Sequence, residues 1–132
     1  MGSIGQTKQE FFMRYIAIAA LVAAFAMPAH AADAEAGARV FRTQCGACHV
    51  VEAGKNRVGP SLFAIVGRMS GQVEGFRYSA ANKDAKLVWT PEVLETYLTN
   101  PKAVVPGTTM AFVGIRNATQ RADLIAYLET VK

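Results

Sequence analysis

The 132-residue sequence predicts an all-α domain in which three main helices and long loops wrap around a bound group. Three segments carry helical signals, and they cover residues 33–44, 89–100 and 119–131. The stretches between them are long and rich in glycine, with no convincing strand pattern and no visible repeat. Long loops are uncommon in a compact domain, but they make sense when they enclose a ligand instead of packing on each other.

The first predicted helix, residues 33–44, has alanines near its start that favour a helix. Asp33 and Glu35 suit the positive N-terminal end of such a helix. Gly37 and Phe41 lie four positions apart and therefore share one face. The glycine would let another backbone approach this face closely.

The second and third predicted helices have recognisable ends. Residues 89–100 begin with a plausible cap at Thr90, followed by a proline in the first turn, and an Asn-Pro pair ends the helix. Residues 119–131 can be capped by Asn117 or Thr119, and their leucines, isoleucine and tyrosine recur at helical spacing. Each helix therefore has an apolar face to pack against a neighbour.

The connecting segments are predicted to be irregular. Residues 50–70 and 74–84 are punctuated by glycine, and residues 102–109 contain a Pro-Gly turn signal. Four apolar side chains in the first of these loops are expected to line a cavity: Leu62, Phe63, Ile65 and Val66.

The strongest chemical signal is the run Cys45-Gly46-Ala47-Cys48-His49. It has the C-x-x-C-H pattern of covalent c-type haem attachment. Residues three apart lie on one face of a helical turn, so both thiols can reach the two vinyl groups along one haem edge. His49 would then project over the haem plane and bind iron through Nε2. The small residues between the cysteines leave the porphyrin edge unobstructed.

Other uses of paired cysteines fit the sequence less well. A zinc site normally needs four ligands, and no Cys or His follows residue 49. A thioredoxin-like site should lie in a βαβ pattern, which the sequence lacks. A disulfide, or a pair of structural thiols, is the remaining alternative.

The N-terminal 31 residues have the pattern of a cleavable secretory signal peptide. Lys8 and Arg14 precede an apolar run over residues 15–27, and a small-x-small site leads to predicted cleavage between Ala31 and Ala32. The competing interpretation is an uncleaved anchor, although the run is short for a membrane span of ~20 residues. Residues 32–132 would form the single mature domain.

The predicted mature part carries 12 Lys+Arg and 9 Asp+Glu, a net charge of +3. Two ionised haem propionates would lower this to about +1. There is no basic run or nucleic-acid motif, which argues against a nucleic-acid partner. A core of this size would gain much of its stability from a buried cofactor.

The second iron ligand can be narrowed but not fixed from the residues alone. His30 lies ahead of the predicted cut, so His49 is the sole histidine of the mature chain. The soft ligands left are Met69 and Met110. Met110 is favoured because its Pro-Gly-containing loop is long enough to reach the opposite haem face. The other possibility is a five-coordinate iron without a second protein ligand. If a methionine does bind, its thioether would raise the reduction potential of the iron.

Taken together, the motifs resemble the class I cytochromes c over nearly the whole mature chain. This resemblance implies the class I cytochrome c fold, with its first and last helices crossing, around one covalently attached haem. The matching residues are Cys45-x-x-Cys48-His49, Gly59-Pro60, Gly67-Arg68, Gly75-Phe76-x-Tyr78, Ala81-Asn82-Lys83, Trp89, Tyr97-Leu98-x-Asn100-Pro101-Lys102, Pro106-Gly107-Thr108-x-Met110-x-Phe112 and Asp123-Leu124-Ile125-Ala126-Tyr127-Leu128.

The resemblance implies roles for the residues around the iron. Cys45 and Cys48 would hold the haem covalently. His49 and Met110 would be the two axial ligands. The Pro60 carbonyl would accept a hydrogen bond from the other ring nitrogen of His49, which fixes the orientation of that ligand. Tyr97 would point its hydroxyl towards the Met110 sulfur.

The resemblance also implies a polar end to the haem site. Tyr78, Trp89 and Thr108 would hydrogen-bond the propionates, with Arg68 nearby as a compensating charge. Taken singly, the aromatic residues could equally be core residues and Arg68 a solvated surface charge.

The sequence departs from the mitochondrial pattern at several positions. Gln44 and Thr109 stand where the animal proteins usually have lysine, and Ala64 replaces a usual glycine. A thinner ring of cations around the exposed haem edge should weaken salt-dependent steering towards acidic partners. The candidates that remain for docking a partner are Arg57, Lys102 and Arg116.

The predicted function is one-electron transfer in the periplasm by a soluble, non-enzymatic monomer. Its partners would be redox proteins, such as a cytochrome reductase complex and a terminal oxidase or reductase of a respiratory chain. A peroxidase-like or gas-binding haem protein would instead need an open iron position. A membrane-tethered domain of a respiratory complex would require residues 1–31 to be retained.

Overall fold

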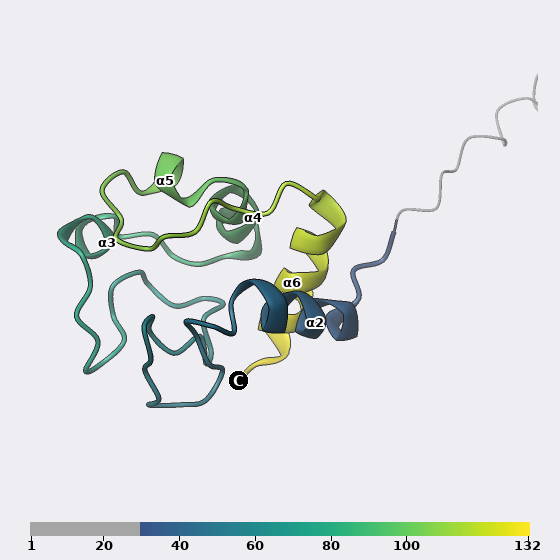
Figure 1. The fold of residues 1–132 in the computed structure, drawn as a ribbon, viewed down its shortest axis with the longest axis horizontal. Coiled ribbons are helices and arrows are strands. Elements are labelled where there is room, and N and C mark those ends of the chain that lie inside the picture. The colour runs from purple at the N-terminus through teal and green to yellow at the C-terminus, as the bar shows by residue number, and fades with distance from the viewer. Residues whose placement is uncertain (1–29) are drawn as a thin grey trace, which may run out of the picture. The chain divides into compact units, whose positions relative to one another are not determined.

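The computed structural model describes residues 30–132 and contains helices but no strand in that range. The helices follow one another as α2 (Ala34–Gln44), α3 (Ala80–Asp84), α4 (Pro91–Thr99), α5 (Pro101–Val104) and α6 (Ala118–Thr130) (Figure 1). A single antiparallel bridge joins Met69 to Val88 among the described residues. The predicted all-α fold is therefore confirmed. The predicted signal peptide lies almost wholly outside the described residues.

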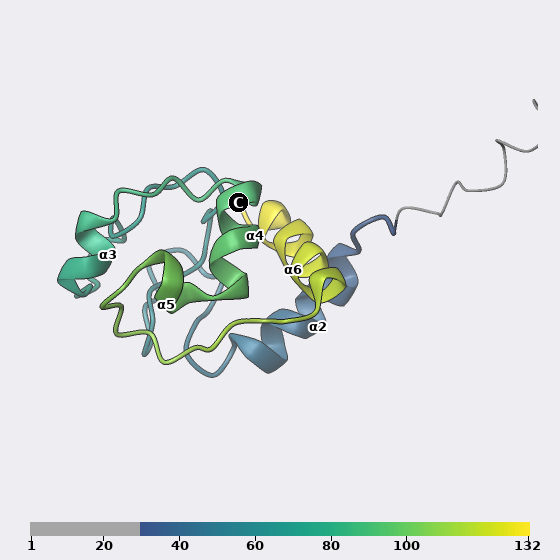
Figure 2. The same ribbon diagram turned by 90° about the horizontal axis from the view of Figure 1, so that it is seen from above.

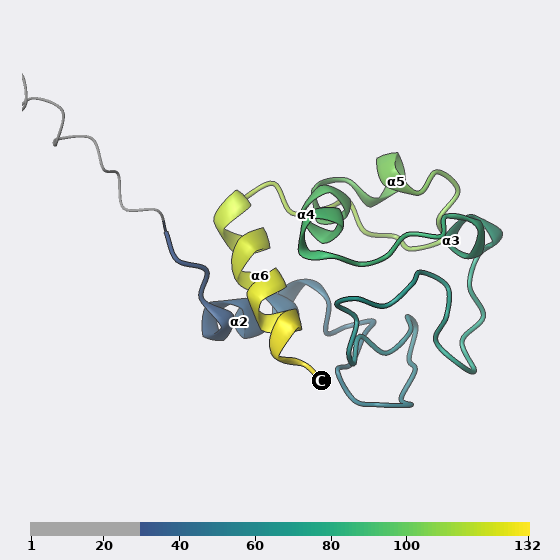
Figure 3. The same ribbon diagram turned by 180° about the vertical axis from the view of Figure 1, so that it is seen from behind.

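Helices α2 and α6 cross and pack against each other, as Figures 1 and 3 show from opposite sides. The crossing depends on Gly37, because a Cβ atom there would collide with the backbone carbonyl of Asp123 on α6. Phe41 and Tyr127 lie beside this point, with ring centroids 5.6 Å apart. The Asp123 carboxylate accepts a hydrogen bond from the Asp33 backbone N–H at 2.8 Å. The start of α2 is thereby fixed to α6.

Helix α4 packs on α6, and Figure 2 shows the two side by side. The side chain of Thr90 accepts a hydrogen bond from the Val93 backbone N–H, so the predicted cap is present. An ion pair between Arg121 on α6 and Glu95 on α4 joins the two helices at 2.7 Å. Arg121 also donates to the Ile115 carbonyl, which holds the chain entering α6.

Two short helices were not expected from the sequence. Helix α3 lies in the stretch predicted to be irregular, and α5 overlaps the predicted loop 102–109. Ser79 and Asn100 cap them through side-chain oxygens that accept from backbone N–H groups. Helices of five and four residues are too short to display a periodic apolar face, so the pattern on which such predictions depend is missing.

The buried apolar side chains come mainly from α2, α4, α6 and the segments beside them. In the described part of the chain, no helix is long and apolar enough to cross a membrane. The loops between α2 and α3 contribute less to this core, and they form much of the wall of a cavity instead.

Candidate functional site

A cavity of about 330 Å³ lies among the described residues. Its lining comes from the long segment between α2 and α4, from residues 109–112, and from the inner faces of α4 and α6. Figure 1 shows the segment that follows α2 below the segment that follows α5, and residues of both segments line the cavity. The lining is mainly apolar, which suits a flat hydrophobic group.

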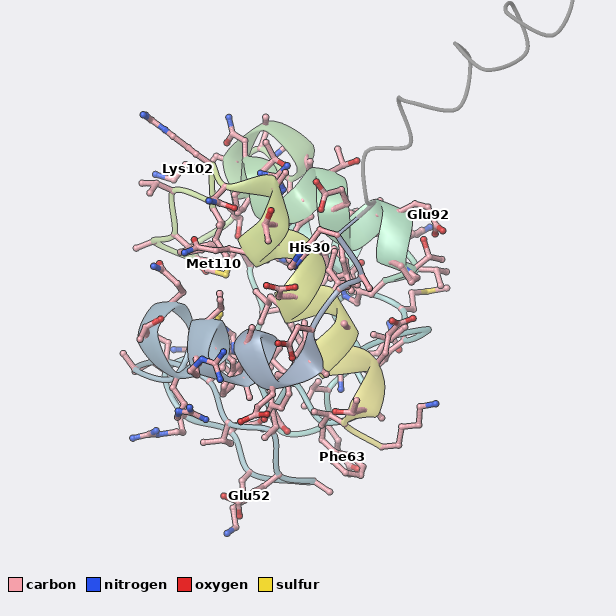
Figure 4. The ribbon with its side chains drawn as sticks, turned by 90° about the vertical axis from the view of Figure 1, so that its right-hand side faces the viewer. His30, Glu52, Phe63, Glu92, Lys102 and Met110 are labelled. Carbon is pink, nitrogen blue, oxygen red and sulfur yellow. The ribbon has the colours of Figure 1, made fainter. Side chains whose placement is uncertain are left out.

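Two of the four apolar residues predicted to line this cavity do so. Leu62 and Ile65 are lining residues. Phe63 and Val66 are not, so that prediction was wrong for them. Phe63 lies at the edge of the molecule near the end of α6 (Figure 4), and Val66 packs against the core. The glycine-rich loop has no regular period, so its sequence does not reveal which side chains face inwards.

The paired thiols lie at the end of α2, on one rim of the cavity. Cys45 caps the helix by donating its N–H to the Phe41 carbonyl, and the N–H groups of Cys48 and His49 donate back to the Cys45 carbonyl at 3.0 and 2.9 Å. This turn brings both free cysteines into the cavity lining. Burial, with a smaller contribution from Cys48, raises the pKa of Cys45 to about 11. Before any haem is attached, Cys45 is therefore a neutral thiol near neutral pH.

The imidazole of His49 is held in one orientation. Its Nδ1 lies 2.8 Å from the Pro60 carbonyl oxygen, which can only accept, so Nδ1 carries the hydrogen and Nε2 is left to bind a metal. Gly59 packs on the ring so closely that a Cβ atom would stand 2.6 Å from Nδ1. Burial lowers the pKa of His49, opposed by the Pro60 hydrogen bond. A pKa below the ordinary 6.5 favours the neutral ring near pH 7, which is the form that binds a metal.

Met110 lies in the cavity lining on the segment that follows α5. The Tyr97 hydroxyl lies 4.0 Å from the Met110 sulfur. The Met110 backbone N–H donates to the Thr108 hydroxyl at 3.3 Å. Met69 also lines the cavity but is 44% exposed and belongs to the bridge with Val88. Both methionines therefore reach the space, and Met110 is the one held beside a buried tyrosine.

The predicted polar residues lie near one another but already have protein partners. Arg68 donates to the carbonyls of Phe63 and Ser61 at 2.7 and 3.0 Å, so its guanidinium is anchored in the loop and is not free in solvent. The Tyr78 hydroxyl accepts from the Val73 N–H at 3.2 Å, which leaves its own hydrogen available to donate. Burial raises the pKa of Tyr78, while Val73 and Arg68 oppose that change.

Trp89 lines the cavity, whereas Thr108 lies outside the lining. Trp89 is buried, lines the cavity and packs on Tyr97 with ring centroids 4.6 Å apart. Thr108 is not a lining residue, and its hydroxyl donates to the Asn82 side chain at 2.9 Å.

Asn82, like Ser79, is a polar lining residue to which the sequence analysis gave no role in the site. Its side-chain oxygen accepts hydrogen bonds from both Ser79 and Thr108, at 2.8 and 2.9 Å. Burial raises the pKa of Tyr97, and its contacts with Asn82 and Thr108 oppose that change. Asn82 therefore connects α3 to the Met110 loop. Two sequence signals could have drawn attention to it: the Ser-x-x-Asn cap pattern that begins at Ser79, and the matching run Ala81-Asn82-Lys83.

The three docking candidates are all exposed. Arg57 donates to the Gly46 carbonyl at 3.2 Å, so its charge is held against the Cys-x-x-Cys turn. Lys102 extends outwards from α5 (Figure 4), and Arg116 lies just before α6.

The donors around the cavity fit one covalently held haem. Two thiols on a single turn, an imidazole with a free Nε2 and a thioether from another segment all reach the same mainly apolar space. Within residues 30–132, no group of three or more Cys, His, Asp or Glu side chains could hold a metal ion by itself.

Comparison with known proteins gives a consistent result. A profile of the cytochrome c family matches residues 34–132. The chain is 56% identical over 87 residues to a cytochrome c of Trypanosoma brucei brucei, covering 66% of this chain and 94% of the relative. It is 50% identical over 99 residues to cytochrome c 2.1 of Caenorhabditis elegans, which covers 75% of this chain and 89% of that relative. It is 47% identical over 110 residues to cytochrome c2 of Blastochloris viridis, which covers 83% of this chain and 86% of that relative.

Proposed function

The chain belongs to the cytochrome c family, and from that premise we propose how its own residues serve one-electron transfer. Membership makes it an electron carrier with a covalently attached haem c, not an enzyme, and its partners are redox proteins. The haem supplies an iron that is reduced and reoxidised by one electron. The observation that carries the residue assignments is the fixed imidazole of His49, which leaves Nε2 as the free donor.

Cys45 and Cys48 are the attachment residues in this proposal. Each would hold the haem through a thioether, for which the S–H and the vinyl double bond are exchanged for C–S and C–H bonds with no atom lost. Their support is their position on a single turn at the rim of the cavity. The small residues between them leave that rim open.

His49 and Met110 are the proposed axial ligands. The hydrogen bond to Pro60 supports His49, because it fixes the tautomer and makes Nε2 the more basic donor. The hydroxyl of Tyr97 supports Met110, since a weak hydrogen bond to sulfur restrains the thioether. Keeping both ligands in both oxidation states limits rearrangement on electron transfer, which makes the transfer fast.

Tyr78, Trp89 and Arg68 are proposed to hold the propionate end. Tyr78 retains a hydrogen to donate, and Arg68 is a fixed, half-buried positive charge. Thr108 shares its hydrogen with Asn82, so a propionate would compete with that amide for it. Arg57, Lys102 and Arg116 are proposed to dock the redox partner, because exposed cations steer encounters with acidic surfaces.

We propose a periplasmic location, with residues 1–31 removed as a signal peptide. The charged start, apolar run and small-x-small site support this. The electron donor would then be a cytochrome reductase complex and the acceptor a terminal oxidase or reductase. Mass spectrometry of the exported protein should find Ala32 at its N-terminus, and an intact Met1 would point to a membrane-tethered form.

Absorption spectra of both redox states, with a pyridine haemochrome assay, test the proposal. We expect a haem that stays with the protein in acidified organic solvent, and a six-coordinate iron in each state. A colourless protein, or release of the pigment, would contradict the attachment. High-spin iron with an open position would favour the peroxidase-like or gas-binding alternative.

A further inference from the structure

The peptide group between Pro60 and Ser61 is hydrogen-bonded on both of its sides. Its carbonyl oxygen, from Pro60, accepts from the Nδ1–H of His49, and the two atoms lie 2.8 Å apart. Its N–H, from Ser61, donates to the side-chain oxygen of Asn56 at 3.0 Å. One planar peptide group therefore lies between the imidazole and the Asn56 amide. Asn56 is not among the lining residues of the cavity, but it reaches His49 through this chain of two hydrogen bonds.

A second hydrogen bond fixes which way the Asn56 amide faces. Its nitrogen donates to the Glu74 carbonyl at 3.1 Å. A carbonyl oxygen can only accept and a peptide N–H can only donate, so the amide oxygen must face Ser61 and the amide nitrogen must face Glu74. Because an amide carries no titrating proton, the Ser61 N–H keeps the same acceptor over the whole working pH range.

The chain of two hydrogen bonds lies in a shielded and rigid part of the loop. Ser61 is 2% exposed, and buried Gly59 packs on the imidazole of His49. The Ser61 hydroxyl donates to the Glu52 carbonyl, and the Ser61 carbonyl accepts from Arg68 at 3.0 Å. These contacts hold the peptide group in place. Hydrogen bonds in such surroundings polarise one another more strongly than they do in water.

We infer that Asn56 is a positioning residue that acts on His49 through the Pro60–Ser61 peptide and lowers the reduction potential. When the Asn56 oxygen accepts from the Ser61 N–H, electron density shifts towards the Pro60 carbonyl oxygen, which becomes a stronger acceptor. A stronger hydrogen bond at Nδ1 makes Nε2 of His49 the better electron donor. A better donor favours the oxidised, more positive iron, so the potential falls. This inference rests on the proposed role of His49 as an iron ligand.

The test compares the reduction potentials of the unchanged holoprotein and of its Asn56→Ala and Asn56→Asp variants. Asn56→Ala removes the acceptor. The preference of the imidazole for the oxidised iron should fall roughly threefold, which raises the potential by about 28 mV at about 59 mV for a tenfold change. Asn56→Asp keeps an acceptor of the same shape and adds negative charge to it, so its potential should fall. Both variants lose the hydrogen bond to Glu74, so loosening of the loops alone would move both potentials in one direction.

Two controls separate the hydrogen-bond chain from other effects. Ala53→Asp places the same charge on an exposed position three residues earlier, away from the Ser61 N–H, and should lower the potential less than Asn56→Asp does. Asn56→Leu keeps the volume of the side chain without an acceptor, and it replaces Asn56→Ala should that variant fold poorly.

Proton magnetic resonance of the reduced holoproteins gives a readout that reports the hydrogen bond itself. The Nδ1–H resonance of His49 should move upfield in Asn56→Ala and downfield in Asn56→Asp, while the Met110 methyl resonance stays in place. If the unchanged protein shows no iron-bound imidazole, the proposed function fails. If the imidazole is bound, the inference is overturned by potentials that shift in the same direction or not at all, by an equal fall in Ala53→Asp, or by an Nδ1–H resonance that does not move.

Discussion

The helical frame, α2, α4 and α6, and the loop wall, residues 45–79, are built by different means. The frame is held by apolar packing and contains fully buried side chains such as Leu124, which is 1% exposed. Among residues 45–79, all of which the structure describes, Ile65 is the one buried large apolar side chain. Buried Ser61 and Ser70 instead hold this wall through hydrogen bonds to backbone groups.

The difference shows which part of the domain can be stable by itself. Apolar burial in the frame supplies folding free energy whether or not a group occupies the cavity. The wall encloses that cavity and contributes little apolar burial, so the bound group has to complete its packing. Substitutions in the frame should therefore lower global stability, while those in the wall should act locally.

The largest effect is expected in the frame, from Gly37→Ala. At an exposed helical site this change would stabilise by ~1 kcal/mol. Here the new Cβ would collide with the Asp123 carbonyl, so we expect a loss of about 3 kcal/mol in the free energy of unfolding by urea. Ala36→Gly in the same helix should cost only ~1 kcal/mol. A stabilised Gly37→Ala variant would show that the helices do not cross at this point.

In the wall, Ser61→Ala should lower the free energy of local opening by about 2 kcal/mol. The change leaves the Glu52 carbonyl and the Phe63 N–H without their hydrogen-bond partner. Hydrogen exchange should speed up over residues 50–63 while α2 and α6 keep their protection. Thr96→Ala, an exposed hydroxyl on α4, should change stability by less than about 0.5 kcal/mol. An equal increase in hydrogen-exchange rate in the wall and in the frame would contradict the view that wall substitutions act locally.

A smaller effect, of opposite sign, is expected from Ala64→Gly. Ala64 has a φ of 49°, a conformation that costs a residue with a Cβ roughly 1 kcal/mol. Glycine should therefore stabilise the protein by about 1 kcal/mol in thermal unfolding, despite its greater freedom in the unfolded chain. Lys86→Gly, also at a φ of 49°, should behave alike. A loss of stability in both would contradict the assigned backbone.

The smallest effect concerns two tyrosines, Tyr97 in the frame and Tyr78 in the wall. Burial raises the pKa of each above its ordinary value of 10.0. Above pH 10 the unfolded chain loses these protons first, so stability should fall as pH rises from 10 through the raised values. Tyr97→Phe should flatten this fall more than Tyr78→Phe, because Tyr97 is buried and Tyr78 is half-buried. The opposite order would contradict this.

Elements with a strong local signal could be predicted from the sequence. Thr90 does cap α4, and Asn117, one of two predicted alternatives, caps α6. The α2–α6 crossing was implied by family resemblance rather than derived. Helices α3 and α5 were missed because each is barely one turn long and owes its start to a single cap.

The site shows the same division. The Cys-x-x-Cys-His turn is a local motif. Its spacing in the sequence was therefore enough to predict that its side chains reach one site. Asn82 gains its role in the site from Thr108, which is distant in the chain, so the cap pattern at Ser79 does not by itself mark Asn82 as a lining residue. For the same reason the sequence could not separate Phe63, at the edge of the molecule, from Leu62 in the lining.

The choice of the second iron ligand is the central claim, and one comparison of spectra tests it most directly. The oxidised holoprotein is examined for the weak red absorption band of a thioether–iron bond in the unchanged chain, in Met69→Ala and in Met110→Ala. We predict that the band persists in the first two and is lost in the third. A band that survives Met110→Ala, or disappears in Met69→Ala, would contradict the assignment.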